Sequence, residues 1–211
     1  FNTFDPNTIY ATKDSVLRSL DGGATWAAIP GSPKFTGRTA IETTLANDSV
    51  IYVMDQTKKF LRSNDAGSSW TTYTISGLTL YGYYDNVLSV SPIDENTVYA
   101  AGFNMYKTVN GGTSWTAVGA GIHVDHHAIE FIPGSNSIYC GNDGGVYRST
   151  NGGTVWTDFT SGLQITQFYR IGSSVTNPSI VYAGAQDNGT KRNSSGTWST
   201  VGGGDGMECL V

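Results

Sequence analysis

The sequence is poor in charge, in cysteine and in long apolar runs. Charged residues make up 14% of its 211 residues, the net charge is −5, and lysine and arginine form no run. These features argue against nucleic acid and anionic membrane as partners. No apolar stretch is long enough to span a bilayer. The two cysteines, Cys140 and Cys209, are too few for a disulfide framework, so we expect unbonded, buried thiols.

One short box, rich in glycine and ending in tryptophan, recurs along the chain. It reads SLDGGATW at residues 19–26, SNDAGSSW at 63–70, TVNGGTSW at 108–115 and STNGGTVW at 149–156. A shorter fifth copy, NSSGTW, ends at Trp198. The five tryptophans of the chain are spaced by 44, 45, 41 and 42 residues. Such regular spacing of a rare residue indicates an internal repeat.

Each box lies within a larger unit of short β-rich runs. A run ending in tyrosine precedes every box (TIYAT, VIYVM, TVYAA, SIYCG and IVYAG), and a second run such as VLRS or FLRS follows it. A further apolar run, such as VLSVSP, lies ahead of the tyrosine run, and no segment keeps a helical period. Four antiparallel strands repeated every 40–45 residues or so are typical of a propeller blade. We call these strands A to D from the centre of the propeller outward, so that A is the innermost strand. The tyrosine lies on B and the box lies between C and D.

The residue types of the box suit a tight turn. Glycine adopts a positive φ without a Cβ penalty, and an Asp or Asn side chain accepts hydrogen bonds from the backbone of its own turn. The Ser or Thr hydroxyl can bond nearby in the same way, and the tryptophan can cover its blade. We therefore predict a structural role for Ser19, Asp21, Gly23, Trp26, Ser63, Asp65, Gly67, Trp70, Thr108, Asn110, Gly112, Trp115, Ser149, Asn151, Gly153 and Trp156.

The box resembles the Asp-box, or BNR, repeat of sialidases, xyloglucan-type endoglucanases and sortilin-type propellers. The segments HVDHHAIEFIP, GNDGGVYRSTNGGTVW, QITQFYRIG, GAQDNGT and GGGDGM, between His123 and Met207, are similar to those of bacterial secreted sortilin-like and glycosyl-hydrolase-like BNR proteins. This resemblance implies an all-β propeller of four-stranded antiparallel blades and an extracellular location. We count about five blades in a single domain over residues 1–211. We expect that domain to be part of a larger propeller, because the chain starts in mid-pattern and its ending, MECLV, stops in mid-strand.

Blade topology places the D-to-A connections and the B–C turns on one face, and polar and aromatic residues gather there. The connections hold Arg38, the stretch from Tyr83 to Asp85, and all three histidines. From this face we select as candidate ligand-binding residues His123, Asp125, His127, Asp143, Gln167, Tyr169, Asp187 and Asp205.

The segment HVDHH is the densest group of these residues. On a strand, His123, Asp125 and His127 would share one face, and two imidazoles with a carboxylate could bind Zn²⁺. Hydrogen bonds to loop backbone and contact with a ligand are the alternatives, and we expect neither a metal nor a cofactor. The sequence GGGDGM is predicted to place Asp205 at the start of an innermost strand.

The sequence does not support a sialidase. That mechanism holds the substrate carboxylate with three arginines, and four of the six arginines here lie on strand C or at the box, which leaves Arg38 and Arg170. A glycoside hydrolase needs two carboxyl groups at a set separation, with Asp125, Asp143, Asp187 and Asp205 as candidates. Exposed tyrosines could stack on sugar rings or pack against blades.

The sequence favours a binding protein over an enzyme, without excluding either class. We predict a secreted or cell-surface propeller, of bacterial type, that recognises carbohydrate or peptide at its channel mouth within a larger protein. The alternative is one half of a xyloglucanase-like active site. The expected partners are a glycan or a peptide and the remaining blades of its own protein, without nucleic acid or membrane insertion.

Overall fold

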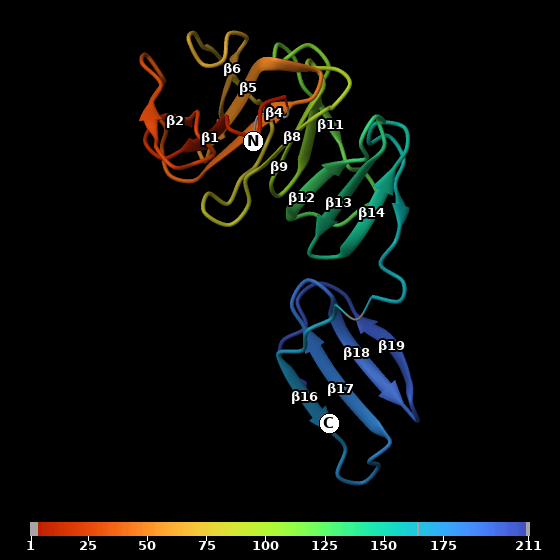
Figure 1. Cartoon of the computed structure of the whole chain (residues 1–211). Coiled ribbons are helices and arrows are strands. Elements are labelled where there is room, and N and C mark those ends of the chain that lie inside the picture. Colours follow the sequence, from red (N-terminus) through yellow and green to blue (C-terminus); the bar gives the residue numbers. More distant parts are fainter. Residues whose placement is uncertain (1–3, 164, 210–211) are drawn as a thin grey trace. The chain divides into compact units, whose positions relative to one another are not determined.

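The computed structural model describes residues 4–163 and 165–209, and they form an all-β fold, as predicted (Figure 1). Nineteen strands are present in these residues and no helix is. Within the same residues no helix has the length and apolar character needed to cross a bilayer. The chain divides into two compact units, residues 1–142 with 146–159 and residues 143–145 with 160–211. Each unit is described by itself, and a single domain over residues 1–211 stays a prediction.

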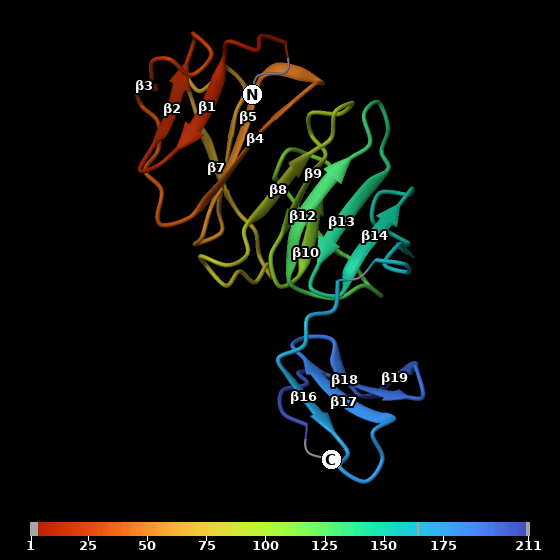
Figure 2. The same cartoon turned by 60° about the horizontal axis from the view of Figure 1, so that its bottom comes forward.

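The first unit contains four antiparallel sheets, of which the first has three strands and the others four (Figure 2). Its strands are β1 (Ile9–Thr12), β2 (Val16–Ser19), β3 (Ala27–Ala28), β4 (Thr39–Thr44), β5 (Asn47–Asp55), β6 (Lys59–Ser63), β7 (Thr71–Thr74), β8 (Val87–Val90), β9 (Val98–Ala101), β10 (Met105–Thr108), β11 (Thr116–Val118), β12 (His126–Phe131), β13 (Ile138–Asn142), β14 (Gly145–Ser149) and β15 (Thr157–Asp158). Consecutive strands pair within each sheet, which is the strand order expected of propeller blades.

The cores of the first unit lie between neighbouring sheets. Along β5, Val50, Tyr52 and Met54 face a cluster shared with β8 and β9, whereas Ile51 and Val53 face a cluster shared with β1 and β2. All five side chains are fully buried. Because successive side chains of a strand point to opposite faces, a strand covered on both sides must be apolar throughout. This explains why the tyrosine runs do not alternate between apolar and polar residues.

The boxes of the first unit share one hydrogen-bond pattern. In each, the Asp or Asn Oδ1 accepts the backbone N–H four residues later, at 2.8–2.9 Å. The Ser or Thr hydroxyl accepts the N–H of the glycine four residues later, at 2.8–3.0 Å. The indole N–H of the tryptophan donates to the carbonyl of that same glycine, at 2.9–3.1 Å. The side chains of each box therefore satisfy several backbone groups of their own turn. In the first three boxes a carbonyl earlier in the chain accepts one further N–H, from Gly22 to Asn7, from Ala66 to Ser49 and from Gly111 to Asn96.

Three tryptophans of the first unit, Trp70, Trp115 and Trp156, pack on the sheet that precedes their own. Trp70 joins the core that contains Ile29, and Trp156 joins the core that contains Tyr99. Trp115 meets Phe60 edge to face, with ring centroids 4.9 Å apart. Trp26 belongs to the first sheet and stays 43% exposed. The box thus closes a turn and also fastens one blade to its neighbour.

Cationic side chains on the third strands make a second kind of link between sheets. Arg62 lies over the ring of Tyr52 and forms an ion pair with Glu95 of the next sheet, with 3.2 Å between Nη2 and Oε1. Lys107 lies over Tyr99 and donates to the carbonyl of Gly152 in the following box. These basic residues therefore join neighbouring blades instead of facing a ligand.

The second unit contains one four-stranded antiparallel sheet. Its strands are β16 (Arg170–Ser173), β17 (Ile180–Ala185), β18 (Gly189–Ser194) and β19 (Thr197–Gly202). The fifth tryptophan box differs from the other four, because Ser194 pairs with Thr197 across a hairpin whose central residues, Ser195 and Gly196, both have positive φ. That is the backbone of a two-residue hairpin turn. Trp198 stacks on Phe168 and is 49% exposed.

The expected innermost strand after Asp205 is absent. Residues 203–209 belong to no strand, and the N–H of Gly206 instead donates to the carbonyl of Ala185, at the end of β17. Residues 206 and 207 approach the backbone of Gly184 closely, and this requires glycine at position 184. A Cβ there would lie only 2.5 Å from the carbonyl oxygens of both residues. Residues 210 and 211 lie outside the described residues. Cys140 and Cys209 are both free thiols.

Candidate functional site

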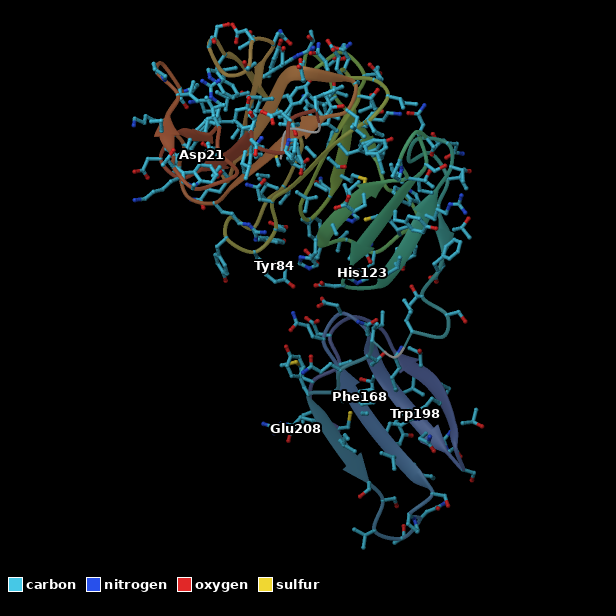
Figure 3. The ribbon with its side chains drawn as sticks, in the orientation of Figure 1. Asp21, Tyr84, His123, Phe168, Trp198 and Glu208 are labelled. Atoms are coloured by element: carbon cyan, nitrogen blue, oxygen red, sulfur yellow. The ribbon has the colours of Figure 1, made fainter. Side chains whose placement is uncertain are left out.

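The loops that join the sheets of the first unit meet the turns between the second and third strands on one surface, called the loop face here. Thr79 donates to Oδ1 of Asn104 at 2.8 Å, and its carbonyl accepts the N–H of Phe103. Phe103 in turn accepts the N–H of Asp125 at 3.2 Å. Tyr84 and His123 lie on the same side of this unit (Figure 3). The predicted gathering of these loops therefore holds for the first unit.

A tyrosine-rich loop stands out on the loop face. Tyr81, Tyr83 and Tyr84 are 53%, 85% and 43% exposed. Nη1 of Arg38, from the preceding inter-sheet loop, donates to the carbonyls of Tyr83 and Tyr84, at 2.9 Å each. Asp85 accepts the N–H of Tyr81 and closes the loop from below. The aromatic rings are thus exposed on a backbone that is held from both sides, an arrangement suited to stacking on a ligand.

Asp85 and Asn86 end this loop beneath the tyrosines and are almost completely buried. Nδ2 of Asn86 donates to the carbonyls of Arg38 and Met54. Oδ2 of Asp85 and Oδ1 of Asn86 make no hydrogen bond. Burial raises the pKa of Asp85, while the Tyr81 N–H and the charges of His127 and Arg38 act in the opposite direction. Burial therefore outweighs these effects, and the pKa of Asp85 is raised from its ordinary value.

The segment HVDHH does not form the regular strand that its alternation suggested. β12 begins only at His126, Asp125 has a left-handed backbone with φ 57°, and a bulge follows His126. His123, Asp125 and His127 therefore do not share one face of a strand, and the expectation that they would was wrong. Nδ1 of His123 bonds its own loop at the Val124 carbonyl, whereas His127 is exposed and meets the ring of Tyr84 edge to face.

His126, which the sequence reasoning left out, is the buried histidine. Its Nδ1 lies 3.2 Å from Sγ of Cys140, and the two side chains are 2% and 0% exposed. Burial lowers the pKa of His126 to about 4 and raises that of Cys140 to about 12. Both groups are neutral at physiological pH, so this contact does not form the thiolate–imidazolium pair of a cysteine nucleophile.

Another carboxyl group with a shifted pKa lies on β4, the innermost strand of the second sheet. Burial and the charge of Glu130, on the innermost strand β12, raise the pKa of Glu42 to about 7. Neither glutamate stands out in the sequence, because a single glutamate within a strand carries no motif. Like-charge repulsion between two inner strands became visible only in the structure.

The second unit holds a polar group of its own, built from the remaining candidates. The hydroxyl of Tyr169 bonds Oε1 of Gln186, and Oδ1 of Asp205 accepts the N–H of Asp187 at 3.0 Å. Nδ2 of Asn188 donates to the carbonyl of Asp143 at 3.0 Å. Asp205 therefore caps the turn of QDNG instead of beginning a strand. Gln167 is exposed. A ligand-binding role for the eight selected residues stays a prediction.

Comparison with known proteins places the chain among propellers. No protein-family model matches it. A xyloglucanase of a Paenibacillus species is 30% identical over 135 residues, which are 53% of this chain and 13% of that protein. The chain therefore spans only a small part of the curated relative that it resembles.

Solved structures show the same fold. The GH74 xyloglucanase from Xanthomonas campestris aligns with a TM-score of 0.59 at 14% identity, over 94% of this chain and 37% of its own. The Niastella koreensis GH74 enzyme aligns with a TM-score of 0.56 at 21% identity, over 93% of this chain and 30% of its own. YCF48 from Cyanidioschyzon merolae aligns with a TM-score of 0.55 at 19% identity, over 94% of this chain and 68% of its own. At these identities the likeness establishes the propeller fold alone.

Proposed function

We propose that this chain is the carbohydrate-recognising part of an extracellular propeller and that the ligand binds on the loop face of its first unit. The exposed tyrosines of residues 81–84, on a loop fixed by Arg38 and Asp85, carry this proposal. Aromatic faces stack on the apolar face of a sugar ring, and a loop ordered in advance loses little entropy on binding.

The local likeness to a xyloglucanase supports a glycan over a peptide. The fold likeness to GH74 enzymes agrees with it, although structures at such low identity carry no information on ligands. Peptide recognition is the competing proposal, because exposed tyrosines are also common at protein–protein interfaces. An extracellular location follows from the glycan ligand and belongs to the same proposal.

A binding assay with matched variants tests this proposal. The chain is titrated with soluble plant and bacterial polysaccharides, xyloglucan among them, and with unrelated peptides. Tyr83→Ala and Tyr84→Ala should each weaken glycan binding by about two- to tenfold, if stacking on each ring contributes about 0.5–1.5 kcal/mol. Tyr169→Ala, in the second unit, should leave it unchanged. Loss of binding in Tyr169→Ala alone would move the site to the second unit, and binding of peptides only would refute the proposal.

Hydrolysis is a second candidate, favoured by the buried Asp85 carboxyl under the tyrosines. A glycosidase uses one carboxyl of raised pKa as its acid, and Asp85 has that property. It also needs a second carboxyl about 5–5.5 or 6.5–9.5 Å away. Release of reducing ends from a bound glycan, abolished in Asp85→Asn, would establish this activity. Unchanged release in that variant would exclude Asp85 as the acid.

A further inference from the structure

The first two sheets carry a concentration of positive charge on the loop face. Five of the twelve lysines and arginines of the chain belong to three neighbouring segments there. The segments are the turn after β1, the loop between the first two sheets, and the turn between β5 and β6 together with the first residue of β6. Their basic residues, called the basic patch here, are Lys13, Lys34, Arg38, Lys58 and Lys59.

Hydrogen bonds hold these segments together as one surface. The N–H of Phe35 donates to the carbonyl of Asp14 at 3.2 Å, which joins the first turn to the loop. Nζ of Lys59 donates to the carbonyl of Lys34 at 3.2 Å, which joins the loop to the second turn. Arg38 then links this surface to the tyrosine loop through the carbonyls of Tyr83 and Tyr84.

The acidic residues around the basic patch do not cancel its charge. Asp55 is 1% exposed, and its oxygens accept the amides of Thr36, Thr57 and Lys59. Asp85 is buried to the same degree. Asp14, beside Lys13, is the exposed acid among these segments. On a chain whose net charge is −5, this surface is therefore positive where the rest is on balance negative.

Arg38 also has capacity left for a ligand. Nη1 is used by the tyrosine loop, whereas Nε and Nη2 make no hydrogen bond within the residues that the structure describes. The side chain is exposed. A guanidinium edge presents two parallel N–H groups, and that spacing matches the two oxygens of a carboxylate.

We propose that the glycan bound on the loop face is acidic, with uronate carboxylates held by the basic patch and sugar rings stacked on Tyr83 and Tyr84. This inference rests on the proposed carbohydrate function and specifies its ligand class. Exposed aromatic rings joined to an arginine, with lysines on the same surface, suit a chain of alternating ring faces and carboxylates. A glycan is favoured over an acidic peptide or single-stranded nucleic acid because the chain resembles a glycan-acting protein over 135 residues.

A charge-matched pair of ligands tests the inference. Oligogalacturonate and its methyl ester have the same sugar rings and differ in the carboxylate charge. We expect the acid form to bind at least about tenfold more tightly at low salt, and the difference to shrink as NaCl screens the charges over a Debye length near 10 Å or less. Equal affinity for the acid and the ester would overturn the inference.

Matched variants test whether the basic patch supplies the charge that holds the carboxylates. In the double variant Lys34→Gln and Lys58→Gln, affinity for oligogalacturonate should fall by about three- to tenfold, while affinity for the ester stays unchanged. Neither lysine side chain makes a hydrogen bond in the described part of the chain, so folding should be preserved. Lys191→Gln, the same change in the second unit, is the control and should bind as the parent does. If Lys191→Gln lost as much affinity for oligogalacturonate as the double variant, the assignment of the charge to the basic patch would be refuted.

Competitors separate this inference from the broader proposal. Polyglutamate or single-stranded DNA that binds as tightly as oligogalacturonate would show a general polyanion surface and overturn the acidic-glycan reading. Binding of neutral glycans alone would overturn it too, yet leave the proposed function standing. Failure of every glycan would remove both.

Discussion

The second and fifth sheets make the same connection, from third to fourth strand, in two different ways. In the second sheet, eight residues from Ser63 to Trp70 form a turn closed by side chains, with Ser63 and Asp65 accepting backbone N–H groups. In the fifth, a two-residue hairpin joins Ser194 to Thr197, and Oδ1 of Asn193 accepts the N–H of Gly196. Trp70 reaches the preceding sheet, whereas Trp198 stacks on Phe168 within its own unit.

The difference shows that the box does more than reverse the chain. A two-residue hairpin is enough to turn the backbone, so the longer box must have a further role. In the first unit that role is to carry the tryptophan onto the neighbouring sheet, and the indole N–H bond to the box glycine fixes the direction of the ring. Stability should therefore depend on box residues in the first unit and much less on the fifth hairpin.

Removing the tryptophan side chain should separate the two regions most clearly. Trp115→Ala deletes a ring that packs on Phe60 between the second and third sheets, and it should cost about 3–5 kcal/mol of unfolding free energy there. Trp198→Ala, at a ring that is 49% exposed, should cost less than half as much. Hydrogen exchange of peptides from each sheet measures both. Equal losses would contradict a packing role limited to the first unit.

Deleting the serine hydroxyl should give the next largest difference in stability between the two sheets. In Ser63→Ala the buried N–H of Gly67 loses its acceptor, and the second sheet should lose about 1–3 kcal/mol. Ser194→Ala, at the matching place in the fifth hairpin, should change stability by no more than about 0.5 kcal/mol. The same exchange experiment reads both variants. A large effect of Ser194→Ala would mean that the hairpin also depends on its hydroxyl.

The smallest expected difference concerns stability at low pH, and the pKa shifts of the box carboxylates give its direction. Hydrogen bonds from Thr25, side chain first, and from Ser19 lower the pKa of Asp21 from 3.8 to about 2, and Ser69 lowers that of Asp65. A lowered folded pKa gives stability that is complete above the unfolded value and is lost as pH falls through the folded value. Thermal unfolding between pH 4 and pH 2 or so should therefore decline less steeply in the double variant Asp21→Asn and Asp65→Asn. An unchanged slope would rule out these carboxylates as its source.

The blades were predictable because their signal repeats. Five tryptophans and five tyrosine runs in step define strand order without any long-range contact. The departure of the fifth turn could also be suspected from NSSGTW, which is a shorter copy of the box. What the repeat could not reveal was that residues 203–209 form no strand, because the bond from the Gly206 N–H to the Ala185 carbonyl is not signalled by any residue type.

The candidate site was harder to predict because it depends on backbone geometry and on distant segments. The left-handed Asp125 breaks the alternation of HVDHH and turns His126 inward, and no residue type in that segment signals a positive φ. The basic patch is spread over 47 positions from Lys13 to Lys59, so it formed no run. Assigning each lysine to its turn of the predicted blades would have brought the patch together.

The alternating side chains of β5 have a consequence for how the first unit unfolds. Ile51 and Val53 belong to one core, and Tyr52 and Met54 to the next. The second sheet therefore cannot melt without uncovering both of its neighbours, so its energy is shared with the adjacent sheets as in a one-dimensional array. Damage at one sheet of the first unit should therefore spread to the sheets packed against it.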